Sequence, residues 1–302
     1  MTVRRNGVAE IHSILRAVPD VAAAVAFYMD ALDSVPDGPV VSLSMAERAL
    51  LGVVDGEVLC QPLGLGRQRV TLLQFDPPGR PYPPGSTSTD LWFQHCAVVV
   101  RDMERAHAQV MAAGALTISV DPQRLPPSTG GVTAFKFRDP AGHPLELLSL
   151  PEGIGDPTWH EGNLHLFMGI DHTAISVSDP EVSRSFYADM LGLRVDARTL
   201  NRGLAQTRLD AVPNDVVDVI ALVPGRVPPH LELLGYRTGT RRRGAAGPAD
   251  ASASRTLASG DIEAIAARLT RHGHALRRGT WNMRSAIAFE DPDGHAWICY
   301  DA

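Results

Sequence analysis

An internal repeat constrains the fold of this chain more than any other feature of its sequence. Residues 11–28 (IHSILRAVPDVAAAVAFY) align without a gap with residues 170–187 (IDHTAISVSDPEVSRSFY). Each segment starts with an alternating, strand-like run, reaches an Asp at an expected helix N-terminus (Asp20, Asp179) and closes on Phe-Tyr. The repeat therefore predicts a strand–helix unit that is used at least twice.

Two further starts have a related form, at residues 93–110 and, more weakly, at residues 253–269. Short strand-like runs follow each start, and each series closes on a distinctive last strand: RVTLLQF (69–75), HPLELLSL (143–150), HLELLGY (230–236) and HAWICYD (295–301). We therefore expect four βαβββ modules at residues 10–76, 91–150, 168–237 and 252–302, and a mixed α+β fold.

The turn before the last strand occurs in two similar copies, FRDPAGHPLELLSL (137–150) and FEDPDGHAWICY (289–300). Asp-Pro followed by Gly favours a β-hairpin in both. His143 and His295 occur in both copies, which indicates a structural role in the hairpin. Glu146 lies in the apolar strand of the first copy, where the second has Ile298, and a buried carboxylate costs free energy unless a charged group meets it.

Composition narrows the classes of partner. The net charge of −6 gives no general attraction to nucleic acid or to an anionic membrane, and no apolar run approaches the roughly 20 residues of a membrane span. The first residues lack the apolar core of a signal peptide, and three widely spaced cysteines fit reduced thiols. We expect a cytoplasmic monomer or homodimer that binds a small molecule.

Polar residues recur at matching positions of the first and last strands. The position seven residues before each helix-start Asp holds Ser13, His95, His172 and Ser254, and the last-strand position holds Thr71, Glu146, Glu232 and Ile298. Imidazole and carboxylate on neighbouring strands are ligands of divalent transition metals. The second and third modules therefore predict one site with His95, Glu146, His172 and Glu232 as ligands.

Each of these residues taken alone has an ordinary explanation. A single His at a strand start is more often a hydrogen-bonded structural residue, and a single buried Glu is more often salt-bridged or catalytic. The metal hypothesis depends on all four falling at equivalent places in two of the four modules. His12 lies one residue out of register, so it should face the other way and be structural or exposed.

The modules, the two LEL strands and the DPxGH turn resemble the vicinal oxygen chelate superfamily, which includes glyoxalase I, type I extradiol dioxygenases, bleomycin and fosfomycin resistance proteins and methylmalonyl-CoA epimerase. The resemblance covers nearly the whole chain. It implies that paired modules close into a cup around one divalent metal ion (Ni, Zn, Fe(II), Mn or Co). The second and third modules would share the metal cup, and the first and fourth would form a metal-free one. Pairing the first with the second, and the third with the fourth, is the alternative.

The resemblance also implies a reaction class. A set of two His and two Glu resembles glyoxalase I, an isomerase or lyase whose metal binds adjacent substrate oxygens while a carboxylate acts as general base. Glu232 is the favoured base and Glu146 the alternative. An Fe(II) extradiol-type ring-cleaving dioxygenase is the runner-up, although such enzymes take their ligands from the last two modules. A non-enzymatic binding protein of the bleomycin-resistance kind is the third possibility.

Three further residues give weaker signals. Tyr236 lies four residues after Glu232 and so shares its strand face, where it is either a donor to a substrate oxygen or a core tyrosine. Arg241, with its two arginine neighbours on the linker at residues 238–250, either recruits an anionic substrate or belongs to a solvated loop. Cys96, next to His95, should point away from the site into the core.

Overall fold

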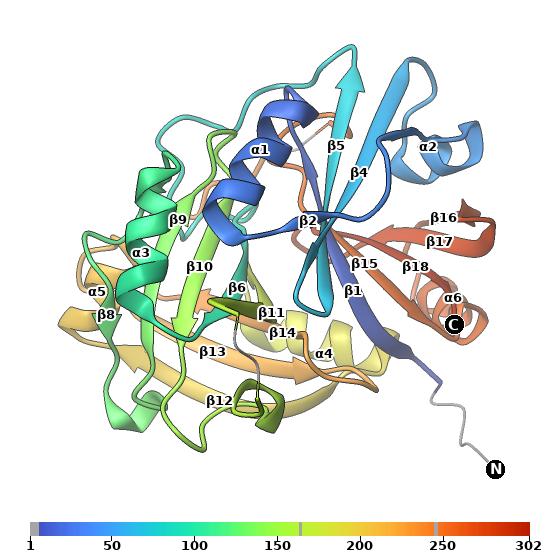
Figure 1. Cartoon of the computed structure of the whole chain (residues 1–302). Coiled ribbons are helices and arrows are strands. Elements are labelled where there is room, and N and C mark those ends of the chain that lie inside the picture. Colours follow the sequence, from blue (N-terminus) through green and yellow to red (C-terminus); the bar gives the residue numbers. More distant parts are fainter. Residues whose placement is uncertain (1–5, 163–164, 245–246) are drawn as a thin grey trace.

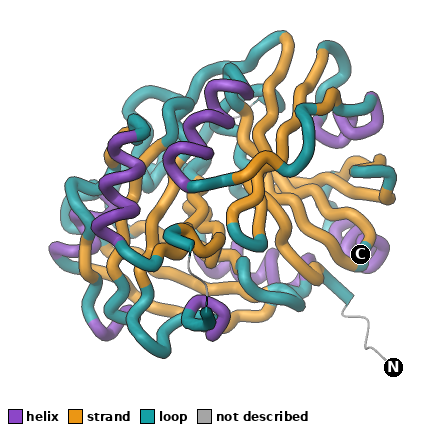
Figure 2. Tube along the Cα trace, viewed as in Figure 1, coloured by secondary structure: helices purple, strands orange, loops and turns teal. Residues whose placement is uncertain are grey.

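A computed structural model describes residues 6–162, 165–244 and 247–302 and shows two nine-stranded sheets. Strands and loops make up most of the trace (Figure 2). The first five residues, which entered the expectation about a signal peptide, lie outside the described residues. Within the described ranges, no helix is long and apolar enough to cross a membrane.

Sheet A is built from the N-terminal and C-terminal parts of the chain. Its strands follow the order β16 (Leu276–Trp281), β17 (Arg284–Glu290), β18 (Ala296–Asp301), β15 (Arg255–Gly260), β1 (Val8–Ala17), β5 (Gln68–Asp76), β4 (Glu57–Leu65) and β2 (Val35–Pro36), with β3 (Val41–Ser42) beside β4. The first and fourth modules therefore form one sheet.

Sheet B is built from the middle of the chain. Its strands follow the order β12 (Arg194–Arg202), β13 (Val216–Val223), β14 (His230–Tyr236), β11 (Phe167–Ser176), β6 (Gln94–Val100), β10 (Pro144–Ser149), β9 (Thr133–Arg138) and β7 (Leu116–Thr117), with β8 (Gln123–Arg124) beside β9. The sheets thus pair the second module with the third, as predicted, and not the first with the second.

The two sheets share one arrangement of central strands. In sheet A the antiparallel pair β1/β15 is flanked by the parallel neighbours β5 and β18, and in sheet B the pair β11/β6 is flanked by β14 and β10. A register shift interrupts β1 between Ile11 and Ser13, and another interrupts β11 between Ile170 and His172. Because the first and last strands of a module are parallel neighbours, their polar residues lie side by side.

The helices are α1 (Val21–Leu32), α2 (Met45–Leu51), α3 (Met103–Ala112), α4 (Pro180–Leu191), α5 (Leu204–Asp210) and α6 (Ile262–Arg271), with short 3-10 turns η1 (Pro127–Thr129) and η2 (Pro157–Trp159). The aspartates of the repeat cap four of them. Asp20 accepts hydrogen bonds from the first-turn N–H groups of α1, and Asp102, Asp179 and Asp261 do the same for α3, α4 and α6.

Helix packing joins the modules in a different order from the sheets. Helix α1 lies beside α3, and α4 packs against α6 (Figure 1). Phe27 and Tyr28 share a buried core with Phe135 of the second module, and Tyr187 shares another with Trp297 of the fourth. Each module therefore contacts one neighbour through its sheet and a different one through its helix.

Two equivalent hydrogen bonds cross between the helix-paired modules. The Tyr28 hydroxyl donates to Asp139 at 3.0 Å, and the Tyr187 hydroxyl donates to Asp291 at 2.8 Å. All four side chains are buried. The last Tyr of the Phe-Tyr repeat thus binds the Asp of the DPxGH turn in the next module.

The histidines of the same turns make a second pair of crossing bonds. Nε2 of His143 donates to the carbonyl oxygen of Ala17 at 2.8 Å, and Nε2 of His295 donates to that of Ser176 at 3.0 Å. Each turn therefore binds the first strand of the preceding module. This agrees with the structural role expected for both histidines.

Tyr28→Phe and Tyr187→Phe should each lower the free energy of unfolding by about 1–3 kcal/mol, because each leaves one oxygen of a buried carboxylate, Oδ2, without its donor. Urea denaturation followed by circular dichroism measures the change. Tyr300→Phe is the matched control, since no hydrogen bond of its hydroxyl is present among the described residues. An equal effect in all three variants would contradict this assignment.

Candidate metal centre

A cavity of about 350 Å³ lies against sheet B, and charged side chains gather on its wall. Apolar residues from several strands and loops line the rest, among them Leu125, Leu148, Leu209, Val217 and Val219. The charged and imidazole residues are His95, Lys136, Glu146, Asp171, His172, Asp196, His230 and Glu232. All four predicted ligands therefore line one cavity.

Three of the four predicted ligands form a tight group. Potential ligand atoms of His95, Glu146 and His172 all lie within 4.8 Å of one another. Nε2 of His95 is 2.7 Å from Oε2 of Glu146, and Nε2 of His172 is 4.0 Å from the same oxygen. The parallel pairing of β6 with β10 and the antiparallel pairing of β6 with β11 bring these side chains together.

Glu232 stands at the edge of this group. Its Oε2 is 3.5 Å from Nε2 of His172, across the parallel pair β11/β14. Its side chain is 21% exposed, against 7% for Glu146. Glu232 is therefore within reach of the group but less enclosed by protein.

His95 supplies the test of whether these residues suit a metal ion. Its side chain is 1% exposed, and neither ring nitrogen has a hydrogen-bond partner in the described ranges. The 2.7 Å approach to Glu146 lacks hydrogen-bonding geometry. Ligand atoms about 2.1 Å from a zinc-sized ion lie roughly 3–3.5 Å apart, so a divalent cation between these side chains would satisfy the buried ring.

Asp171 holds His172 in place, and the sequence analysis missed it. Its Oδ2 lies 2.9 Å from Nδ1 of His172, and its Oδ1 accepts a 2.8 Å hydrogen bond from the indole N–H of Trp159. In a regular strand residues 171 and 172 would point to opposite faces. The bulge after Ile170 removes that alternation. A carboxylate on Nδ1 leaves Nε2 free to face the cavity, as in many metal sites.

Two further cavity residues could have been found from the sequence. His230 lies two residues before Glu232 on the same strand, and its Nε2 is 3.6 Å from Oε1 of Glu232. Lys136 lies opposite Glu146 in the β9/β10 hairpin, and its ammonium group donates to Asp210 at 2.5 Å. Period-two spacing predicts the first position and hairpin register the second.

The charges of the cavity shift one another's ionisation. Burial alone would raise the pKa of Glu146, but Lys136 and His95 lower it to about 2. At Glu232 burial would also raise the pKa, but the charge of His172 lowers it to about 2. Burial would lower the pKa of His172, but Glu232 and Asp171 raise it to about 9. Without a metal, His172 therefore carries a proton that partly balances the carboxylates.

The three residues that gave weaker signals, Tyr236, Arg241 and Cys96, have different surroundings. Tyr236 lines the cavity, and its buried hydroxyl has no hydrogen-bond partner within the described residues. Burial raises its pKa well above the usual value, so the hydroxyl keeps its proton. Arg241 donates to the carbonyl of Ser178 at 2.6 Å and is not among the lining residues. Cys96 is fully buried in the core between the sheet and the helices.

In sheet A, residues at the ligand positions bind one another. Ser13 and Thr71 occupy the places of His172 and Glu232, and their hydroxyl oxygens are 2.8 Å apart. Ile298 occupies the place of Glu146 within an apolar cluster. Leu50 and Leu51 of α2 join the same cluster. Both groups of three possible ligand residues found in the described ranges lie in sheet B.

The register corrects one sequence alignment. Arg255 pairs with Leu15 as His95 pairs with Ala174, so the fourth-module equivalent of His95 is Arg255 and not Ser254. The Arg255 guanidinium is buried and donates to backbone carbonyls of the preceding loop. A fixed positive charge therefore occupies the position equivalent to His95.

Comparison with known proteins identifies the same architecture elsewhere. The family model "Glyoxalase/Bleomycin resistance protein/Dioxygenase superfamily" matches residues 10–147 and 169–298. Glyoxalase I from Zea mays is similar in structure, with a TM-score of 0.62 and 16% identity, over 97% of this chain and 92% of that one. A putative dioxygenase from Bacillus subtilis has a TM-score of 0.63 and 14% identity, over 98% and 86%. No curated protein matches the sequence.

Metal affinity should depend on pH, because an incoming ion must displace the proton of His172. With a His172 pKa of about 9 in the metal-free protein, the apparent affinity should rise about tenfold per pH unit from pH 6 to 8 and level off above pH 9. Zinc titration against a competing chelator measures this. Calorimetry in two buffers should show about one proton released per ion. An affinity independent of pH would contradict the protonation state.

Asp171→Asn should weaken metal binding by about 10–100-fold, because Nδ1 of His172 loses its carboxylate. Trp159→Phe should have a smaller effect in the same direction. Asp291→Asn is the matched control, since this buried carboxylate also accepts a bond from an aromatic side chain but lies in sheet A. Zinc affinity by chelator competition decides. Equal affinity of the Asp171 variant and the parent would remove Asp171 from this role.

Proposed function

Because the chain belongs to the glyoxalase/bleomycin resistance protein/dioxygenase superfamily, we propose that it is a metal-dependent enzyme of glyoxalase type. It would isomerise a small substrate, or eliminate a group from it, by moving a proton next to a carbonyl. The observation that carries the proposal is one cavity lined by two histidines and two glutamates at equivalent strand positions.

The proposed ligands are His95, Glu146, His172 and Glu232. A divalent ion such as Ni, Zn, Fe(II), Mn or Co would supply stabilisation of the negative charge that develops on two adjacent substrate oxygens. The mixed nitrogen and oxygen donors suit this class of cation.

Glu232 is the better candidate for the general base. Glu146 is nearly enclosed and lies 2.7 Å from His95. Glu232 is three times as exposed, and its nearest imidazole nitrogens, on His172 and His230, are 3.5 and 3.6 Å away. A carboxylate held this loosely can turn toward substrate. It would take a proton from one carbon and return it to the neighbouring carbon, which leaves the enzyme unchanged.

Tyr236 would orient the substrate. Its hydroxyl is protonated, buried at the cavity wall and without a partner among the described residues. An oxygen of the substrate can accept this hydrogen bond. The apolar side chains of the wall, including Leu148 and Val219, would contact the non-reacting part of the molecule.

A ring-cleaving dioxygenase is the second candidate, and one observation favours it. The tight group contains two histidines and one carboxylate, which is the ligand set of many non-haem Fe(II) oxygenases. Extradiol enzymes, however, take their ligands from the last two modules. In this chain the possible ligands come from the second and third modules, and the fourth has Arg255 and Ile298 at the matching positions. The glyoxalase-type reaction therefore remains the first choice.

Metal content and oxygen use separate these candidates. The protein should be purified without chelator and assayed aerobically with catechols, and separately with thiohemiacetals of α-ketoaldehydes. Bound Ni or Zn with isomerisation and no oxygen uptake supports the proposal. Bound Fe with catechol-dependent oxygen uptake replaces it with the dioxygenase. Binding of these compounds without turnover would instead indicate a binding protein.

Glu232→Gln should lower kcat by about 100-fold or more while metal stays bound by the other three ligands. His95→Ala and Glu146→Gln should lose metal, because each removes a member of the tight group. Thr71→Val is the control, since it changes the equivalent position of sheet A. Elemental analysis and kinetics on each variant decide. If Glu146→Gln alone kept its metal and lost turnover, Glu146 would be the general base and Glu232 would not.

A further inference from the structure

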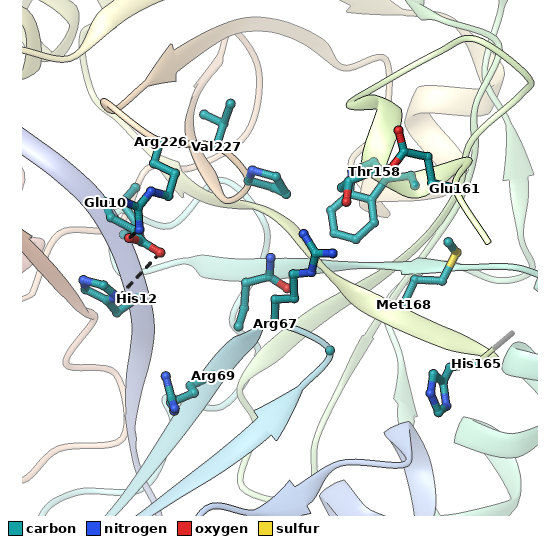
Figure 3. Close-up of a pocket in the computed structure, with 15 residues that line it drawn as sticks. Glu10, His12, Arg67, Arg69, Thr158, Glu161, His165, Met168, Arg226 and Val227 are labelled. Atoms are coloured by element: carbon teal, nitrogen blue, oxygen red, sulfur yellow. Dashed lines mark hydrogen bonds and ion pairs between the residues drawn. The ribbon is translucent and has the colours of Figure 1, made fainter. Parts of the chain in front are cut away.

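A second cavity, of about 580 Å³, lies where the two sheets meet. Its wall comes from β1, the β4–β5 turn, η2 and the residues after it, the start of β11 and the loop before β14. Figure 3 shows Arg67 in the middle of the labelled side chains, with Glu10, His12 and Arg226 to one side and Thr158 and Glu161 to the other. None of its lining residues lines the metal cavity.

Two glycines, Gly66 and Gly169, allow the β4–β5 turn to pack closely on β11 beside this inter-sheet pocket. A Cβ on Gly66 would lie 2.2 Å from the carbonyl oxygen of Met168, and a Cβ on Gly169 would lie 2.4 Å from Oε1 of Gln68. Gly169 has a φ of +144°, which other residues rarely adopt. Oε1 of Gln68 accepts the backbone N–H of Ile170 at 3.0 Å. The turn of sheet A is therefore seated closely on the first residues of β11.

Arginines outnumber glutamates in the lining of the pocket, although the protein carries a net charge of −6. Three arginines line it against two glutamates. Arg226 pairs with Glu10 at 2.6 Å, and Arg69 pairs at the same distance with Asp37, which lies outside the pocket. Arg67 makes no hydrogen bond or ion pair with any residue that the structure describes. One guanidinium therefore has all its donors available.

A second donor lies beside Arg67. Gln68 is only 7% exposed, and its amide oxygen is already bound to β11. The amide nitrogen at the other end has no hydrogen-bond partner in the described part of the chain. An uncommitted amide donor next to an uncommitted guanidinium suits an oxyanion.

The opposite wall offers apolar surface. Trp159 is nearly buried, and its indole N–H is committed to Asp171, so the ring presents carbon atoms to the pocket. Met168, Val227 and Pro228 line the same space. The lining thus combines two oxyanion donors with an aromatic and aliphatic wall.

We propose that the inter-sheet pocket is a second ligand site, which binds an organic anion through Arg67 and Gln68 and packs its apolar part against Trp159. The shared chemistry is a carboxylate or a phosphate ester on a small ring or chain. Arg recognises both groups through paired N–H donors. The site is separate from the metal cavity, because the two share no lining residue, although Trp159 connects them through its hydrogen bond to Asp171.

Calorimetric titration of the metal-loaded protein with benzoate, phenyl phosphate and neutral benzyl alcohol tests the site. At least one of the two anions should bind saturably, and benzyl alcohol should not. Arg67→Gln should weaken anion binding by about tenfold or more, as expected for a hydrogen bond to a charged group. Arg105→Gln is the matched control, because this exposed arginine of α3 lines neither cavity.

The comparison of anions identifies the ligand class. Arg67-dependent binding of phenyl phosphate alone indicates phosphate esters, and that of benzoate alone indicates carboxylates. Metal affinity and turnover should be unchanged in Arg67→Gln, which separates this site from the metal centre. No saturable binding of either anion, or binding that survives Arg67→Gln unchanged, overturns the proposal.

Discussion

A buried glutamate, Glu146, and a partly exposed one, Glu232, lie on strands of one sheet, and neighbouring residues of sheet B supply positive charge to them. Lys136 reaches the cavity from the neighbouring strand, and a protonated His172 supplies a second charge in the absence of metal. Ionised carboxylates removed from water are stable only with such partners. A divalent ion would satisfy this requirement more completely than a proton, since it could also engage the unpartnered ring of His95. The clustered carboxylates and the unpartnered imidazole of His95 are thus the features that would favour metal binding.

Sheet A fills the positions equivalent to the proposed ligands with a different set of residues. Its equivalent positions carry a pair of hydroxyls that bind one another, an isoleucine, and a buried arginine. The short helix α2 places leucines against this face, where the cavity has about 270 Å³, against about 350 Å³ in sheet B. Hydroxyl pairs and apolar side chains require no external cation. The two halves therefore share strand order and register but differ in the residues at these positions. Sheet A has hydroxyls and an isoleucine there, and sheet B has imidazoles and carboxylates.

Regular periodicity made the fold and the four proposed ligands predictable from the sequence. The Phe-Tyr repeat and the LEL strands predicted the order of elements, and the sheets pair the modules as expected. Asp171 was missed because a β-bulge interrupts the alternation of side-chain directions along the strand, and no residue type in the sequence marks this bulge. Arg255 was missed for a related reason, since counting back from a helix cap assumes a strand–helix connection of constant length. The inter-sheet pocket joins segments from the first and third modules, so no local pattern predicts it.

The alternating contacts of the modules close into a ring. Sheets join the first module to the fourth and the second to the third, while helices join the first to the second and the third to the fourth. Cutting the chain at the connection between the second and third modules would leave each half with an intact helix interface and two exposed sheet edges, on β1 and β6 in one half and on β11 and β15 in the other. Unpaired edges of central strands seek partners. Two such half-chains, expressed separately, should therefore associate when mixed, as in fragment complementation. Each half alone would be prone to self-association.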